Sequence, residues 1–117
     1  MRVERELKVH ADPVSKHDLR QGSTYFFVTF VDEEMLIPTV KTVVYVGRDL
    51  EALDSGQVYF QDVMSFREGV RYDTASTESF AEFHCGSEDE LEHVFEFEDA
   101  LDVLLACSFR RAQREVQ

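Results

Sequence analysis

Alternating apolar and polar positions recur along this chain and predict a series of β-strands. Residues 25–31 are aromatic and β-branched, between a glycine-serine pair and three acids, so we expect a strand that is apolar on both faces. Residues 35–46 predict a second strand, with Pro38 near its beginning where a missing N–H is tolerated. The short link between the two runs, residues 32–35, favours an antiparallel hairpin.

Three later segments continue this pattern. Residues 57–61 predict a third strand, and residues 79–85 alternate as a fourth strand with one wetter face. Residues 91–98 also alternate, and they form either a further strand or an extended approach to the element that follows.

A short helical segment is predicted between the third and fourth strands. Asp62 is placed to cap it, because a short acidic side chain accepts hydrogen bonds from the free amide groups of a first helical turn. Gly69 closes it, since glycine tolerates the left-handed conformation at a helix exit. Residues 74–78 are typical of a loop.

The carboxy-terminal part of the chain has apolar residues at three- and four-residue spacings and predicts an amphipathic helix over residues 100–114. Its apolar positions are Leu101, Leu104, Leu105, Cys107, Phe109 and Ala112. We expect Asp99 to cap this helix and the arginines near its end to match the helix dipole. At the other end of the chain, residues 1–20 fit a helix up to Pro13 or an edge strand, and we expect them to pack loosely.

This order of elements predicts an α+β fold. We expect a mostly antiparallel, strongly twisted sheet of about four to six strands, open or half-closed, with the carboxy-terminal amphipathic helix packed on it. The 117 residues are 44% apolar, which suits a single globular domain spanning residues 1–117. The strand at residues 25–31 is expected inside the sheet, with the helix on one face and loops or a partner on the other.

The charge of the chain bears on its partners. The net charge is −12, and residues 78–102 contain ten carboxylates without one Lys or Arg. Such a field repels nucleic acid and attracts basic partners. We therefore expect no direct nucleic-acid binding and a basic protein partner, as in small acidic inhibitors and immunity-type factors, which share only size and charge with this chain. The carboxylates expected to bind this partner are Glu88, Asp89, Glu90, Glu92, Glu96 and Asp99.

A second interpretation stays open beside the first. The acidic surface then serves only for solvation, and the protein acts as a homo-oligomer, such as a homodimer that buries the second apolar face of the strand at residues 25–31. Sedimentation distinguishes the two, because a homodimer dissociates on dilution.

Catalysis, cofactors and membrane insertion are not indicated by the sequence. Phosphate-binding loops, nucleophile elbows and H-E-x-x-H are absent, so we expect no cofactor and favour a protein without enzymatic activity. Cys85 and Cys107 are not in C-x-x-C spacing, and each is predicted to be a buried thiol in a reducing, cytoplasmic setting. No apolar run is long enough for a signal peptide or a membrane span.

Glu82, His84 and His93 form a weaker alternative site, for a divalent metal. Glu82 and His84 share a strand face, and His93 comes alongside if residues 91–98 pair antiparallel with residues 79–85. Two imidazoles and a carboxylate suit such an ion. Their spacing matches no established motif, so two histidines at the edge of an apolar face are the preferred interpretation, and no metal site is predicted.

Overall fold

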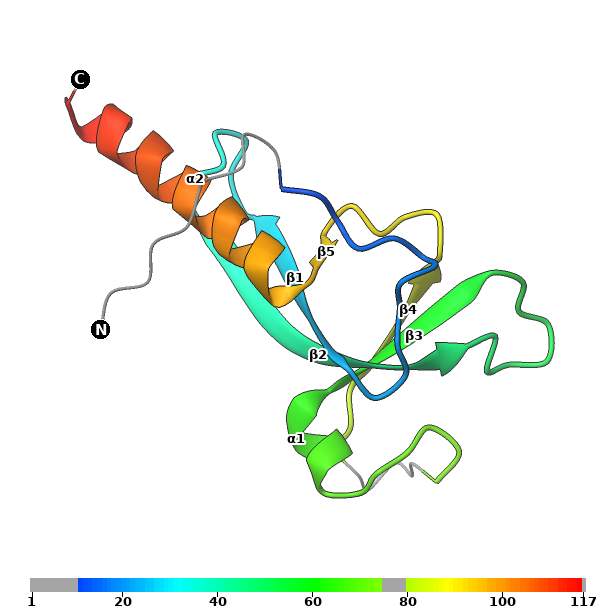
Figure 1. Cartoon of the computed structure of the whole chain (residues 1–117). Helices are drawn as coiled ribbons and strands as arrows, with labels where there is room; N and C mark the ends of the chain where they lie inside the picture. The colour runs from blue at the N-terminus through cyan, green and yellow to red at the C-terminus, as the bar shows by residue number, and fades with distance from the viewer. Residues whose placement is uncertain (1–10, 75–79, 117) are drawn as a thin grey trace.

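A computed structural model describes residues 11–74 and 80–116 of the chain (Figure 1). The elements are β1 (Thr24–Phe30), β2 (Pro38–Arg48), β3 (Gln57–Asp62), α1 (Val63–Arg67), β4 (Phe83–Ser87), β5 (Val94–Phe95) and α2 (Phe97–Val116). The α+β prediction is confirmed. The expectations for residues 1–10, for most of the loop at 74–78, for the carboxylate of Glu78 and for the start of the strand at Ser79 lie outside the described residues.

All strand pairs are antiparallel, and the order across the sheet is β4-β3-β2-β1-β5. The two end strands, β4 and β5, do not pair with each other, so the sheet is not closed into a barrel. The predicted hairpin is confirmed, because β1 pairs with β2 from Thr24 opposite Val44 to Phe30 opposite Pro38. As predicted, β1 is an inner strand.

The second strand begins at Pro38, three residues later than predicted. The link before it is a turn built on Asp32, whose carboxylate accepts hydrogen bonds from the backbone N–H groups of Leu36 and Ile37 at 2.9–3.1 Å. Met35 has a φ of 58° within this turn. The extended alternation seen in the sequence therefore starts only after the turn is complete.

Apolar side chains are buried on both faces of the sheet. The inner face, which carries Tyr25, Val43, Tyr45, Val58 and Phe60, packs with Val14, Leu91 and Val94. The outer face is covered in two places: α2 packs over Val28, Phe26 and Phe95, and α1 with Tyr72 packs over Val44, Val46 and Tyr59. A helix therefore covers one face of β1 and loops cover the other, in agreement with the sequence-based expectation.

The segment at residues 91–98 is only briefly a strand. Val94–Phe95 pairs with β1, and α2 begins at Phe97. The carbonyl of Glu96 already accepts a helical hydrogen bond from the N–H of Ala100 at 2.9 Å, which places Glu96 at the helix cap. The prediction of Asp99 as the cap is wrong, and Asp99 lies in the first turn.

The two cysteines differ in exposure. Cys107 on α2 is 2% exposed, as predicted, but Cys85 is exposed. Cys85 lies on β4, an end strand that pairs only with β3, and neither described helix packs over it. The prediction of a buried Cys85 is therefore wrong.

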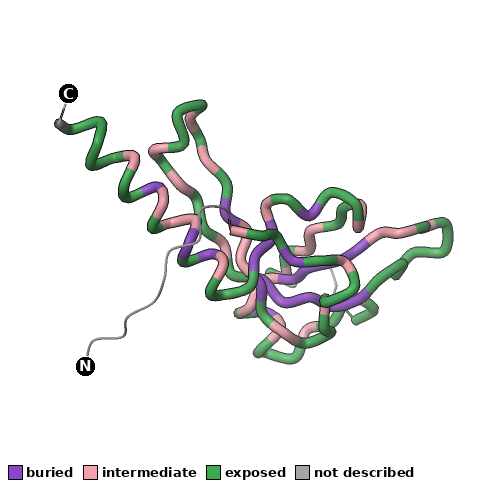
Figure 2. The backbone as a smooth tube through the Cα atoms, turned by 45° about the horizontal axis from the view of Figure 1, so that its top comes forward, coloured by how far each residue is buried: buried purple, intermediate pink, exposed green. Residues whose placement is uncertain are grey.

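Helix α2 continues past the sheet, as Figures 1 and 2 show, and its last residues with described side chains, 111–115, are all exposed. Within residues 11–74 and 80–116, neither helix has the length and hydropathy needed to cross a bilayer.

Candidate functional site

The segment between β4 and β5, residues 88–93, links the two edge strands of the sheet, and we call it the crossing loop. Leu91 anchors it by packing into the inner-face core with Tyr25 and Val94. The N–H of Glu88 donates to the carbonyl of Gly56 at 2.8 Å, and the N–H of Val94 donates to the carbonyl of Leu91 at 3.0 Å. The crossing loop thus places most of the predicted partner-binding carboxylates over or beside the inner face.

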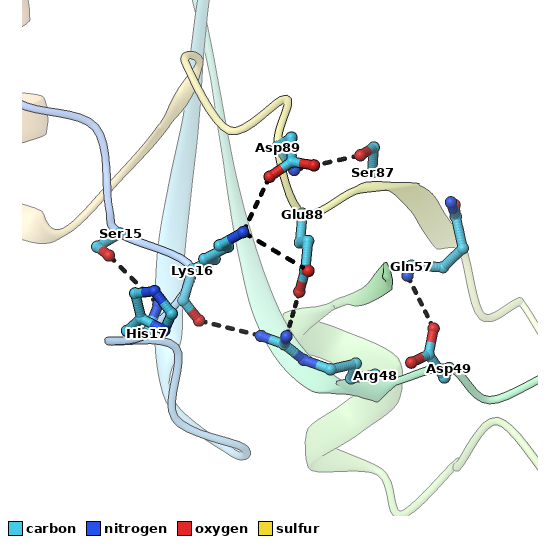
Figure 3. A network of polar contacts seen from close by, with 9 residues as sticks. All are labelled: Ser15, Lys16, His17, Arg48, Asp49, Gln57, Ser87, Glu88 and Asp89. Carbon is cyan, nitrogen blue, oxygen red and sulfur yellow. Dashed lines mark hydrogen bonds and ion pairs between the residues drawn. The ribbon is translucent and has the colours of Figure 1, made fainter. Parts of the chain in front are cut away.

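Two of these carboxylates are engaged by bases from distant parts of the chain (Figure 3). The ammonium of Lys16 lies 3.0 Å from Oδ1 of Asp89 and 3.8 Å from Oε1 of Glu88. The guanidinium of Arg48 pairs with the other oxygen of Glu88 and also donates to the carbonyl of Lys16 at 3.0 Å. The run of acids without bases in the sequence is therefore partly neutralised in the fold.

This ion cluster joins three segments: the amino-terminal segment, the end of β2 and the crossing loop. The Glu88 side chain is 19% exposed and that of Asp89 is 73% exposed. The hydrogen bond to Asp89, with the negative charges of Asp89 and Glu88, raises the pKa of Lys16. Glu88 is thereby a positioning residue for the crossing loop, and its role in binding a partner stays a prediction.

The remaining predicted carboxylates fall into two groups. Glu90, Glu92 and Glu96 are exposed and form no ion pair with a described residue. Asp99, half-buried in the first turn of α2, has an interaction of its own. The fold thus leaves the first three available to a partner.

Helix α2 exposes a line of large apolar side chains that the sequence pattern assigned to the core or left out. Phe97, Leu101, Leu105 and Phe109 are 57%, 38%, 38% and 53% exposed. Their spacing of four residues places them along one side of the helix. We call these four residues the apolar ridge. Ala100, Val103 and Leu104 face the sheet, and Cys107 is buried. The ring of Phe97 contacts Phe26 of β1 edge-to-face at a centroid distance of 5.5 Å while staying 57% exposed.

A pocket of about 260 Å³ lies between the inner face and the crossing loop. Its apolar walls include Phe27, Phe60, Leu91 and Val94, and its polar groups include His84, His93 and Glu90. The rings of His84 and His93 both contact Phe27, with centroid distances of 5.5 Å and 4.9 Å. The two histidines are thus brought together, by a route that the sequence pattern did not indicate.

The pairing under which the two histidine strands would lie side by side does not occur. β4 pairs with β3 and β5 pairs with β1, so the histidines approach from opposite ends of the sheet. Glu82 bonds to the ammonium of Lys41 at 2.5 Å instead of joining the histidines. Among residues 11–74 and 80–116, no three or more His, Cys, Asp or Glu side chains gather in a way that could hold a metal ion.

The surroundings of His84 favour its neutral form. Burial, and then the positive charge of Lys41, lowers the pKa of His84 below its ordinary value of 6.5, against the opposing effect of Glu82. Its Nε2 atom is buried and has no hydrogen-bond partner among the described residues. A neutral imidazole offers one donor and one acceptor, and the buried Nε2 leaves one of these unused among the described residues.

Comparison of the chain with protein-family models, with curated proteins and with solved structures gives no match. Arguments about function therefore depend on the residues and geometry described above.

Proposed function

We propose that this protein is a cytoplasmic, non-catalytic binding module that engages a basic protein partner, as inhibitors and immunity-type factors do. The apolar ridge of α2 carries this proposal, together with the acids that precede it. Glu96 directly precedes Phe97, the first residue of the ridge, and Glu92 is exposed on the crossing loop. The partner surface proposed here is the ridge with Glu92 and Glu96.

The ridge supplies the apolar part of such an interface. Exposed apolar patches with polar rims are typical of protein interaction sites. Burying a fully exposed Leu or Phe side chain stabilises a complex by about 1.5–3 kcal/mol, and the ridge residues would contribute part of this because they are already half covered. Four such side chains in a row form a continuous strip along a rigid helix.

The carboxylates supply direction and selectivity. With a net charge of −12, the protein attracts basic proteins over a distance of about 10 Å at moderate ionic strength. Charges at the rim of an interface mainly raise the association rate and disfavour wrong partners. Glu92 and Glu96 suit this role because they are exposed and are not paired with a described base.

A pull-down with the full chain, eluted by a salt gradient, tests the proposal. We expect a basic protein to elute at moderate salt and to elute earlier from the double variant Glu92→Gln/Glu96→Gln. Glu33→Gln/Asp73→Asn is the matched charge control, because it also removes two charges and both acids are exposed outside the proposed surface. Equal elution from the double variant and from wild type would contradict a role for these acids.

Self-association is a second candidate, favoured by the charge pattern of α2. The first turn is acidic, with Glu98 and Asp99, and the last turn contains Arg114. Two copies packed antiparallel along their ridges would place the acidic end of each helix beside the basic end of the other, in an isologous dimer.

Sedimentation of the full chain separates the two candidates. A homodimer would dissociate on dilution and would be lost in Leu105→Glu. A protein that stays monomeric at all concentrations would exclude self-association and leave the basic partner as the function of the ridge.

A further inference from the structure

The pocket beneath the crossing loop has the size and walls of a site for one aromatic ring. Its volume is about 260 Å³, whereas an engineered apolar cavity of about 150 Å³ is enough to bind benzene. Phe27 and Phe60 contact each other edge-to-face at 5.2 Å and both line the pocket. Aromatic walls of this kind favour offset or edge contacts with another ring.

Gly86 leaves part of this space open. It lines the pocket and pairs with Val58, a residue of the inner-face core. A Cβ atom placed on Gly86 would meet no atom within 4 Å. The strand therefore has room for a larger residue here, and the space is available to a ligand.

The polar groups of the pocket indicate what the ring would carry. His84 lines the pocket with its ring beside Phe27, and its Nε2 is buried out of reach of solvent, so this atom is not a contact for a ligand in the pocket. Glu90 lines the same pocket and is exposed, which places a carboxylate at its opening. The ammonium of Lys41 is held by Glu82, so it does not oppose a cation at that opening.

We propose that this pocket binds a small aromatic amine, with the ring between Phe27, Phe60 and Leu91 and the ammonium group beside Glu90. The strongly negative charge of the protein favours a cationic ligand over a neutral or anionic one. This site is separate from the ridge of α2, so it stands or falls independently of the proposed partner binding.

Titration of the full chain with tyramine, followed through backbone amide NMR signals, tests the site. We expect saturable shifts at Gly86, Leu91 and His93, which line the pocket. 4-Ethylphenol lacks the ammonium group and should bind roughly threefold to fivefold more weakly, the factor expected for one exposed ion pair.

Two variants locate the binding. Gly86→Val fills the open space and should abolish tyramine binding, while Thr42→Val, an exposed change on β2, should leave it intact. Gly86→Ala, a smaller change, should weaken binding if the valine variant fails to fold. Glu90→Gln should remove the preference for tyramine over 4-ethylphenol, and Glu33→Gln should not.

Each contrary result would overturn the proposal. Shifts that do not saturate, or shifts spread over the acidic surface, would show that tyramine associates only as a nonspecific counter-ion. Full affinity in both folded Gly86 variants would place the ligand elsewhere. Equal affinity for tyramine and 4-ethylphenol would show that Glu90 does not contact the ligand's ammonium group.

Discussion

Lys16 donates a hydrogen bond to Asp89 at 3.0 Å, across 73 residues of sequence. In the sequence, Asp89 belongs to a run of acids without a base. In the fold, the amino-terminal segment and the end of β2 bring Lys16 and Arg48 to that run. The acidic segment therefore has two parts. The carboxylates in the ion cluster hold the crossing loop in place, and the others remain available to a partner.

Loss of the Glu88–Arg48 pair should destabilise the fold modestly. We expect Glu88→Gln to lower the free energy of unfolding by less than about 1 kcal/mol, because both side chains are partly in solvent. A double-mutant cycle with Arg48→Met in urea unfolding should give a positive coupling energy that shrinks at high salt. Strict additivity of the two variants would show that the pair does not stabilise the crossing loop.

Asp62 should be a stronger stabilising residue than its exposure implies. Its carboxylate accepts from the N–H and hydroxyl of Ser65 at 2.9 Å and 2.6 Å, and from the N–H of Glu82 at 2.8 Å. Asp62→Ala should lower the free energy of unfolding by about 1–2 kcal/mol, the usual cost of losing a helix cap. Asp62→Asn, which keeps one acceptor oxygen, should cost less, and urea unfolding of both variants measures the difference. Equal losses would contradict a capping role.

Stability should fall in mild acid because of His84. Burial, followed by Lys41 and opposed by Glu82 and Asp62, lowers the pKa of this imidazole, and His93 lowers it further. Below the ordinary value of 6.5 the unfolded chain takes up a proton that the folded protein resists. The stabilising contribution is complete above pH 6.5 and is lost as the pH falls through the lowered pKa of the folded state.

Urea unfolding between about pH 7 and pH 5 measures this dependence. His84→Gln should show a flatter profile in that range. The carboxyl groups of Asp62 and Glu82 do not interfere, because their pKa values are lowered below 3.8 and 4.5. For Asp62, burial opposes this shift and the hydrogen bonds from Glu82 and Ser65 outweigh it; for Glu82, the hydrogen bond from Lys41 is the main cause. Parallel profiles for wild type and variant would show that His84 does not cause the pH dependence of stability.

Only one thiol should react quickly with a thiol reagent in the folded protein. Cys85 is exposed, whereas Cys107 is buried, with its sulfur 3.6 Å from the carbonyl of Leu36 in the turn after β1. Ellman's reagent should therefore modify Cys85 at once and Cys107 only on unfolding. Cys85→Ser should remove the fast phase, and fast modification of two thiols would contradict the burial of Cys107.

The features that the sequence predicted well are those with local causes. Asp62 and Gly69 mark the two ends of α1 as expected: Asp62 is the observed cap, and Gly69 has a φ of 94° just after the helix. The β1–β2 hairpin is also local. Each of these depends mainly on the conformational preferences of residues a few positions apart.

The features that the sequence did not predict are those with distant causes. Whether β5 pairs with β4 or β1 is decided by packing of Leu91 and Val94 against residues more than sixty positions away, such as Tyr25. The ion cluster and the histidine contacts with Phe27 follow from that pairing. The width of the helix face was also misjudged, because the sheet contacts only part of a broad apolar stripe.

Leu104 and Leu105, which are neighbours on α2, should respond oppositely to truncation. Leu104 packs with Val28, Phe95 and Ala100 on the outer face, whereas Leu105 belongs to the exposed ridge. Leu104→Ala should lower the free energy of unfolding by about 1–3 kcal/mol, somewhat less than a fully buried leucine because the site is half covered. Leu105→Ala should change it by less than about 1 kcal/mol.

Binding should show the reverse order. Leu105→Ala should weaken association with a partner or a second copy, because the exposed parts of the ridge side chains are buried only in the complex. Leu104→Ala should leave affinity unchanged once the fraction of folded protein is taken into account. Urea unfolding and sedimentation or pull-down of the same two variants give both results. A large loss of stability in Leu105→Ala would mean that the ridge serves the fold, and the proposed interface would then have to lie elsewhere.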